Sequence, residues 1–234
     1  MAQRLVYIDG IGDVTLAKRR GTRSLRLSIN PSGRIRVGLP YWLPYKAAIS
    51  FAKSRRDWIT EQQVLNQHAL LSNGLRIGKA HTLYFYRDTD SRVIRTRVDK
   101  ISIRISSPYD EHDDRVQVRA RVACEKALAA ESRTILPQRL KTLSALHNYP
   151  YKELRIRKLT SRWGSCSNSK VITLSYFLMQ LPWELIDYVI LHELVHTSYL
   201  NHSPQFWQAL EALVPGAKAR QKEVKLHKPR IQPI

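Results

Sequence analysis

The sequence has little that would direct the protein out of a reducing compartment. Its 234 residues include only 2 cysteines, Cys124 and Cys166, which lie far apart and form no disulfide framework. No apolar run follows a basic start, so we expect no secretory signal peptide. No stretch of about 18 apolar residues is present, so we also expect no membrane span. Together these absences predict a cytoplasmic location.

Acidic residues are scarce as well. Asp and Glu total 19 against 39 Lys and Arg, so the formal net charge is +20. An excess of positive charge attracts polyanions, which suggests an anionic substrate, or contact with a nucleic acid or nucleotide through a basic surface. A basic surface that only keeps the protein soluble is the other interpretation, because no DNA- or RNA-binding motif accompanies the charge.

The most informative residues are histidines. His192, Glu193 and His196 form an H-E-x-x-H motif, and His202 follows six residues after His196. On a helix, His192 and His196 lie one turn apart on one face, where two imidazoles can bind a divalent metal, usually zinc. Glu193 can then take a proton from a water molecule that the metal activates. His202 could supply the third protein ligand of one catalytic zinc ion.

The neighbouring sequence favours a buried site. Residues 183–191 are apolar over most of the helix circumference, as expected for a helix inside a core. Ser203 and Pro204 suit the start of a second helix over residues 204–214, so His202 lies on the connection between the two helices. The structural alternative is a buried helix whose histidines are only hydrogen-bonded, but polar groups on such a helix are costly unless something binds them.

Two known kinds of zinc site have related spacings. The spacing of the three histidines equals that of metzincin proteases. However, Tyr199 replaces the metzincin glycine, and both methionines, Met1 and Met179, precede the motif, so the downstream Met-turn is missing. A gluzincin-type site would take a downstream glutamate as third ligand, and Glu211 remains the alternative to His202.

Alternating residues predict β-structure in the first part of the chain. Residues 13–39 are expected to form strands with a turn at residues 30–33. In the hairpin around this turn, three basic side chains share one face: Arg26, Arg34 and Arg36. A helix is expected over residues 44–63 and further strands over residues 75–105, so this lobe is a mostly antiparallel sheet with one helix.

The rest of the chain predicts a second set of elements. A long helix is expected over residues 113–147, with a kink or break at Pro137. Strands are expected over residues 153–157 and 171–176, joined by a loop at residues 162–168. A small sheet between two helices, the second of which carries H-E-x-x-H, is the minimal zincin arrangement. Its edge strand can pair with an extended substrate.

We therefore predict an α+β fold with a zincin-like metallopeptidase core. The expected division is a β-rich amino-terminal lobe over residues 1–108, a zincin-like catalytic domain over residues 109–216, and a basic carboxy-terminal tail over residues 217–234.

Residues near the motif are candidates to contact the substrate. The loop places Gly164 near the expected metal. Three side chains could contact substrate or stabilise an oxyanion, and the sequence does not distinguish among them: Arg162, Ser165 and Tyr199. Cys166 is better explained as a small buried hydrophobic residue than as a nucleophile or metal ligand, and Trp163 as a core residue.

Three segments carry a family resemblance: Ser161-Arg-Trp-Gly-Ser-Cys-Ser167, Ile186-Asp-Tyr-Val-Ile-Leu-His-Glu-Leu-Val-His196 and Asn201-His-Ser-Pro-Gln-Phe-Trp207. In order and spacing they resemble the YgjP-like family of predicted zinc metallopeptidases, and more distantly SprT-like and WLM proteases. Residues 23–37 also resemble the opening hairpin of that family. The resemblance implies metal ligation by His192, His196 and His202 and acid/base catalysis by Glu193. Members of the family are also described as UTP pyrophosphatases.

These observations give three hypotheses. The first is a zinc-dependent hydrolase of the peptidase type, in which activated water attacks a peptide bond of a polypeptide with Glu193 as general base. The second is a metal-dependent nucleotide (UTP) pyrophosphatase, which suits the charge but lacks a glycine-rich phosphate loop and the carboxylates that magnesium prefers. The third is a nucleic-acid-associated protein that uses its basic surface.

Overall fold

The chain divides into two compact units, which lie within Met1–Leu71 and Ser72–Gln232. The computed structural model describes residues 3–29, 34–67 and 70–231. For residues 63–67 it describes the backbone without the side chains. Both units combine helices with small mixed sheets, so the α+β class is confirmed. Residues 72–108, which the sequence pattern assigns to the amino-terminal lobe, belong to the second of these compact units. No helix in the described ranges is long and apolar enough to cross a membrane.

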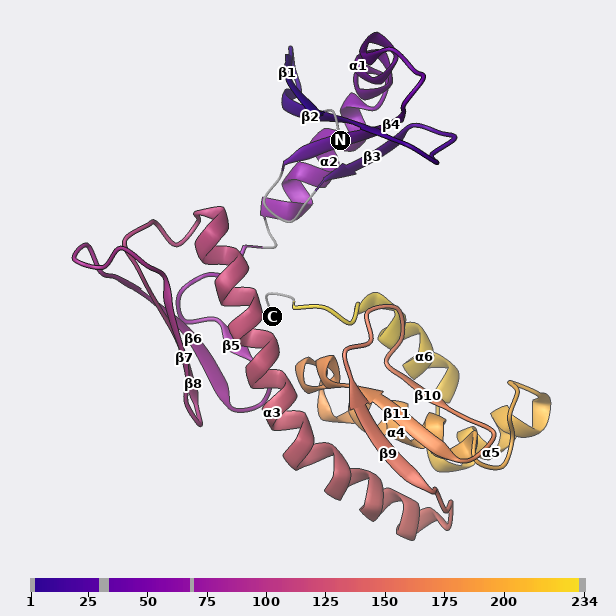
Figure 1. Ribbon diagram of the computed structural model, residues 1–234. Helices are drawn as coiled ribbons and strands as arrows, with labels where there is room; N and C mark the ends of the chain where they lie inside the picture. Colours follow the sequence, from indigo (N-terminus) through magenta and orange to yellow (C-terminus); the bar gives the residue numbers. More distant parts are fainter. Residues whose placement is uncertain (1–2, 30–33, 68–69, 232–234) are drawn as a thin grey trace. The chain divides into compact units, whose positions relative to one another are not determined.

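The first unit is a four-stranded sheet with two helices packed on one face (Figure 1). Its elements are β1 (Gln3–Ile8), β2 (Gly12–Arg19), β3 (Arg26–Ile29), β4 (Ile35–Pro40), α1 (Tyr45–Lys53) and α2 (Arg56–Gln67). The strand order is β1-β2-β4-β3, with β2 parallel to β4 and the other neighbours antiparallel. Alternate strand residues form the core beneath the helices: Val14, Leu16, Ile35, Val37 and Leu39.

The predicted hairpin of the first unit is present. Across β3 and β4, Arg26 pairs with Gly38 and Ser28 pairs with Arg36, so both arginines lie on the face opposite the core. The predicted turn at residues 30–33 lies outside the described residues. The sheet is mostly antiparallel as predicted, although β2 pairs in parallel with β4.

The prediction of a single helix over residues 44–63 is wrong, because two helices occupy this region. The first helix ends where the hydroxyl of Ser54 donates to the carbonyl of Phe51 at 2.9 Å, and Arg56 begins the second. A side chain that bonds the last turn of a helix competes with continuation of that helix.

The second unit begins with another four-stranded sheet, ordered β5-β6-β8-β7, which packs against the long helix α3. The elements are β5 (Arg76–Ile77), β6 (His81–Arg87), β7 (Arg95–Val98), β8 (Ser102–Ser107) and α3 (Asp114–His147). Leu83, Ile103 and Ile105 are buried as the alternation predicts. Ile101, two residues before Ile103, precedes β8 and is exposed.

The sequence predicts a kink or break at Pro137, but the helix does not break there, because α3 continues to His147. Proline removes one backbone hydrogen bond from a helix interior. Here apolar residues on both sides of it, Leu136 and Leu140, are fully buried. We attribute the continuity of the helix to this tertiary packing, which outweighs the local cost.

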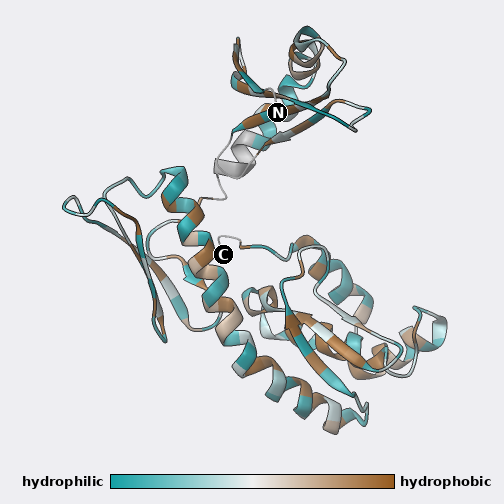
Figure 2. Ribbon diagram, viewed as in Figure 1, coloured by the Kyte–Doolittle hydropathy of each residue, from teal (hydrophilic) through white to brown (hydrophobic). Residues whose placement is uncertain are grey.

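The remaining elements form a three-stranded sheet and the last helices. They are β9 (Glu153–Arg157), β10 (Gly164–Cys166), β11 (Val171–Ser175), η1 (Tyr176–Gln180), α4 (Trp183–Val195), α5 (Pro204–Leu213) and α6 (Ala217–Leu226). β11 is central, parallel to β9 and antiparallel to β10, a strand that the sequence assigned to a loop. Hydrophobic residues concentrate in β11 and α4 (Figure 2). The expected basic tail is largely α6, anchored by buried Ala217 and Val224.

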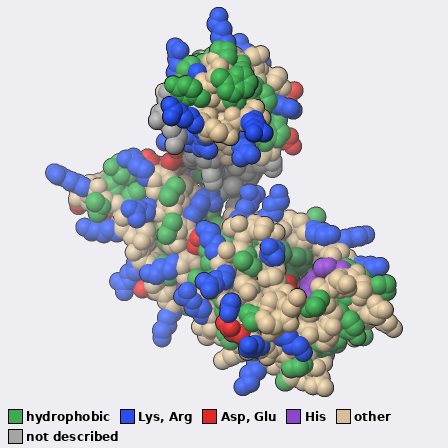
Figure 3. Space-filling view, turned by 45° about the vertical axis from the view of Figure 1, so that its right-hand side comes forward, with side chains coloured by type: hydrophobic (Ala, Val, Ile, Leu, Met, Phe, Trp, Pro, Cys, Tyr) green, Lys and Arg blue, Asp and Glu red, His purple; other side chains and the backbone are tan. Residues whose placement is uncertain are grey.

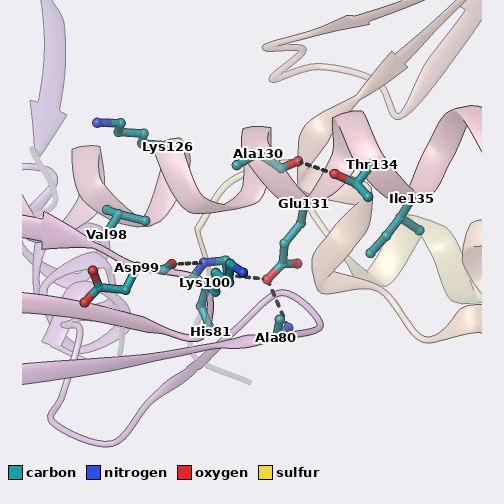
Figure 4. A pocket seen from close by; sticks show the side chains of 10 residues that line it. All are labelled: Ala80, His81, Val98, Asp99, Lys100, Lys126, Ala130, Glu131, Thr134 and Ile135. Atoms are coloured by element: carbon teal, nitrogen blue, oxygen red, sulfur yellow. Dashed lines mark hydrogen bonds and ion pairs between the residues drawn. The ribbon is translucent and has the colours of Figure 1, made fainter.

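A buried ionisable pair joins the β5–β8 sheet to α3 (Figure 4). His81 Nδ1 lies 2.5 Å from the carboxyl group of Glu131, and His81 Nε2 donates to the carbonyl of Asp99 at 2.9 Å. The backbone amides of Lys79 and Ala80 also donate to the Glu131 carboxyl group, at 2.8 and 3.0 Å. The pair forms part of a pocket of about 730 Å³. Glu131 therefore accepts from two backbone amides and bonds the His81 ring, which ties the sheet to the helix.

Replacing Glu131 by Gln is expected to destabilise the second unit. The amide group would place N–H donors against backbone amides that need acceptors, at a cost of about 1–3 kcal/mol for each buried donor left unpaired. The free energy of unfolding in urea measures the effect. Glu153→Gln is the matched control, because Glu153 pairs only with the exposed Arg155, and it should change stability little. Equal stability of the two variants would contradict the role of Glu131.

Candidate functional site

The helix that carries H-E-x-x-H is fixed at both its start and its middle. Lys79 donates from its ammonium group to the carbonyl of Leu181 at 2.5 Å, one residue before the N-cap Pro182. In the middle of the helix, Asp187 accepts two hydrogen bonds from the guanidinium of Arg139 on α3. Most of the other side chains of α4 are buried in the core. The motif therefore lies on an element with little freedom to move.

The structure brings the three predicted ligands together. One nitrogen from each of His192, His196 and His202 lies within 4.8 Å of the others. The two Nε2 atoms of His192 and His202 are 3.1 Å apart. His196 follows the last residue of α4, and Ser203 caps α5 by accepting from the amide of Phe206, so the connection returns His202 to the motif. A group of histidine side chains reaches the surface of this unit (Figure 3).

The protonation of the histidines suits metal binding. Burial and the neighbouring imidazoles of His196 and His202 lower the pKa of His192 to about 3. Burial also lowers the pKa of His196, although its bond to a backbone carbonyl opposes this shift. His196 Nδ1 donates to the carbonyl of Tyr199 at 2.8 Å, which leaves the lone pair on Nε2. Both imidazoles are therefore neutral at pH 7, the form in which histidine binds metals.

An aromatic ring supports the triad from one side. Phe206, on α5, is fully buried, and its ring centroid lies 5.0, 4.5 and 4.8 Å from those of His192, His196 and His202. Trp207 lies beside His202 at 5.9 Å. An apolar wall on one side fixes ring orientation and limits access of water.

Glu193 is buried between α4 and β10. Its side chain is only 5% exposed, and a Cβ added to Gly164 would lie 2.7–2.9 Å from its carboxyl atoms and Cγ. Burial raises the pKa of Glu193 to about 8, while the positive charge of Arg162 opposes this rise. A carboxyl group with a raised pKa can both accept and donate a proton near neutral pH. Only a glycine at position 164 leaves room for it.

The donor set fits a divalent ion. Two nitrogen ligands at the usual zinc distance of about 2.0–2.1 Å, in a tetrahedron, lie about 3.3 Å apart. The separation of 3.1 Å between His192 Nε2 and His202 Nε2 is close to that value. Three imidazole ligands suit zinc better than magnesium or calcium, which prefer oxygen ligands. The triad can therefore hold one such ion and leave a fourth position open.

The other predicted residues are distributed around this centre. Ser165 alternates with Gly164 along β10, so its side chain lies on the face away from Glu193. The hydroxyl-bearing ring of Tyr199 is partly exposed. Glu211, the alternative ligand, instead accepts from the amides of Gly216 and Ala217 at the start of α6. Trp163, expected in the core, is only partly buried.

Cys166 is half-buried and does not belong to the metal-binding group of histidines. Burial and the nearby charge of Glu193 raise the pKa of its thiol to about 11. A neutral thiol is neither a metal ligand nor a nucleophile at pH 7. The interpretation of Cys166 as a small apolar residue is therefore favoured by its surroundings.

Two supporting groups were not found from the sequence. The carbonyl of Tyr199 orients His196, but a backbone atom leaves no signal in residue type. Phe206 was predicted only as part of the helix over residues 204–214. Its position four residues after His202, one turn along the chain, was the available signal for contact with the site.

Comparison with known proteins places this site in a family context. The family model "YgjP-like, metallopeptidase domain" matches residues 23–227. A crystal structure of the metallopeptidase zymogen of Pyrococcus abyssi abylysin is similar to the chain, at 26% identity and a TM-score of 0.38. It covers 42% of this chain and 99% of its own. The metallopeptidase zymogen of Methanocaldococcus jannaschii jannalysin gives 22% identity, a TM-score of 0.34 and coverage of 38% and 91%. No curated protein matches.

Each histidine of the triad is expected to be needed for zinc binding. Replacing His192, His196 or His202 by Ala removes a zinc ligand, so the affinity for zinc should fall. Loss of a hydrogen-bond partner of a ligand lowers metal affinity by roughly 10–100-fold, and loss of the ligand itself should lower it by more. Competition with a chromophoric chelator gives the dissociation constants. The control is His112→Ala, because His112 is exposed and bonds Asp110. Unchanged zinc binding in the three variants would rule out the triad as the metal site.

Proposed function

We propose that this chain, which belongs to the YgjP-like metallopeptidase family, cleaves peptide bonds with one zinc ion held by His192, His196 and His202. Membership of the family makes it a metal-dependent hydrolase. The observation that carries the proposal is the burial of the Glu193 carboxyl group. Glu193 directly follows His192, the first histidine of the triad, in the helix.

Glu193 is the proposed general base and acid. A zinc ion bound by the triad supplies Lewis acidity, which favours attack of water on a carbonyl carbon. The Glu193 carboxylate takes a proton from the attacking water and then donates it to the nitrogen of the leaving amine. Because burial raises its pKa to about 8 and Arg162 opposes that rise, the group can serve in both directions.

An extended polypeptide is the proposed substrate. β10 is an edge strand of the order β10-β11-β9, and it packs against α4 beside Glu193. An edge strand offers free backbone groups to which a peptide can add as a further strand. Among the candidate oxyanion contacts we favour Arg162, because its charge acts on Glu193, whereas the side chain of Ser165 points to the other face.

Replacing Glu193 by Gln should keep zinc bound and abolish hydrolysis. The amide cannot accept the proton of water, so kcat should fall by at least about 100-fold, the usual contribution of a general base. Turnover of unfolded polypeptides and of UTP is measured for both proteins at equal zinc content. Activity of the zinc-loaded variant near that of the wild type would contradict the role of Glu193. Hydrolysis of UTP alone by the wild type would contradict the choice of a peptide bond.

Replacing Gly164 by Ala should displace the Glu193 carboxyl group without removing the metal. The new Cβ would come within 2.7 Å of Glu193 Oε1, and a displacement near 1 Å can cost about 100-fold in rate. Zinc content and kcat are measured together. Cys166→Ala, on the same face of β10, removes volume instead and should change kcat little. Equal kcat values for the two variants would show that the fit of Gly164 against Glu193 is unimportant.

A further inference from the structure

The first unit has a sheet face that the described helices of the same unit, α1 and α2, do not cover. One face of β1-β2-β4-β3 packs its apolar residues against α1 and α2. The register places Arg26 beside Gly38 and Ser28 beside Arg36 on the opposite face. Alternation along a strand keeps these four residues on one side. The guanidinium groups of Arg26 and Arg36 and the hydroxyl of Ser28 therefore project from adjacent strands. They surround Gly38, which has no side chain.

The connection from β2 to β3 closes a hollow over this face. The hollow has a volume of about 410 Å³, and Gly21, Thr22 and Ser24 of the connection line it together with the sheet residues. The hydroxyl of Thr22 donates to the carbonyl of Arg19 at 3.1 Å, which fixes the turn of the chain. Four guanidinium groups line this space: Arg19, Arg23, Arg26 and Arg36. Its volume lies in the range of about 300–1,000 Å³ that is usual for small-ligand sites.

These arginines have no carboxylate partner. The sequence contains no Asp or Glu between Val14 and Arg56. Within the residues that the structure describes, no ion pair joins any of the four arginines to an acid, and the buried Nε of Arg36 has no hydrogen-bond partner. A buried guanidinium nitrogen without an acceptor is costly. A solvated basic surface would spread its charges apart, whereas here four converge on one hollow.

We propose that this hollow binds a ligand with several phosphate groups. The planar guanidinium fork matches two phosphate oxygens at once, and hydroxyls and backbone amides complete such sites. Four positive charges exceed what a single phosphate needs, so an oligophosphate or a short run of a nucleic-acid backbone fits the charge better. Both sources offer the same closely spaced phosphate oxygens. The site lies wholly in the first unit and shares no residue with the proposed peptidase site.

The test compares two charge-matched double variants of the full-length protein. Arg26→Gln with Arg36→Gln removes two charges from the hollow. Lys46→Gln with Lys53→Gln removes two exposed charges from α1, on the other side of the sheet. Inorganic tripolyphosphate and a single-stranded oligonucleotide are titrated by calorimetry at several salt concentrations. Circular dichroism checks that both variants fold.

The expected result is loss of tripolyphosphate affinity by about 100-fold or more in the arginine variant, because two charge-assisted contacts are removed, and little change in the lysine variant. Both variants keep the histidine triad, so phosphate bound to a metal there contributes equally to both. If the natural source is a nucleic acid, the oligonucleotide binds more tightly and tripolyphosphate competes with it. Failure of both probes to bind at low salt, equal affinities of the two double variants, or oligonucleotide binding that tripolyphosphate does not displace would overturn the proposal.

Discussion

The site depends on one constraint, which is that a carboxyl group is held in a buried position between a helix and a strand. Glu193 is 5% exposed, and the backbone of Gly164 passes so close that a Cβ could not fit. Burial favours the neutral acid, and the charge of Arg162 counteracts it. A more exposed carboxyl group would titrate near its ordinary pKa and would be a weaker base toward the attacking water. The packing of β10 on α4 thus sets the chemistry of Glu193.

The positions of the three histidines are constrained as well. His192 and His196 are half-buried and His202 is exposed, and together their side chains form a set of nitrogen donors. Phe206 excludes water from one side, and the carbonyl of Tyr199 fixes the tautomer of His196. Ligands held in this way lose little freedom when an ion binds, so binding costs less ordering entropy than in a flexible site.

The sequence predicts the parts of the site that local spacing determines. H-E-x-x-H places two histidines one turn apart, and the cap at Ser203 places His202, because both depend on helix geometry alone. The strand β10 and the fit of Gly164 against Glu193 depend on packing between distant segments, which local patterns do not contain. Pro137 fails as a helix breaker for the same reason, since the buried residues around it decide the outcome.

Catalysis does not explain the positive charge of the chain. The proposed peptidase site uses three imidazoles and one carboxyl group, and Arg162 is the basic residue whose charge acts on Glu193. The arginines that converge on the hollow belong to the first unit, whereas that site belongs to the second. The two units are linked by the chain, so a ligand bound in the hollow raises the effective concentration, at the second unit, of any molecule attached to that ligand. The bond-breaking step itself does not change. Anion binding in this unit would therefore act on substrate recruitment, and so on KM rather than on kcat.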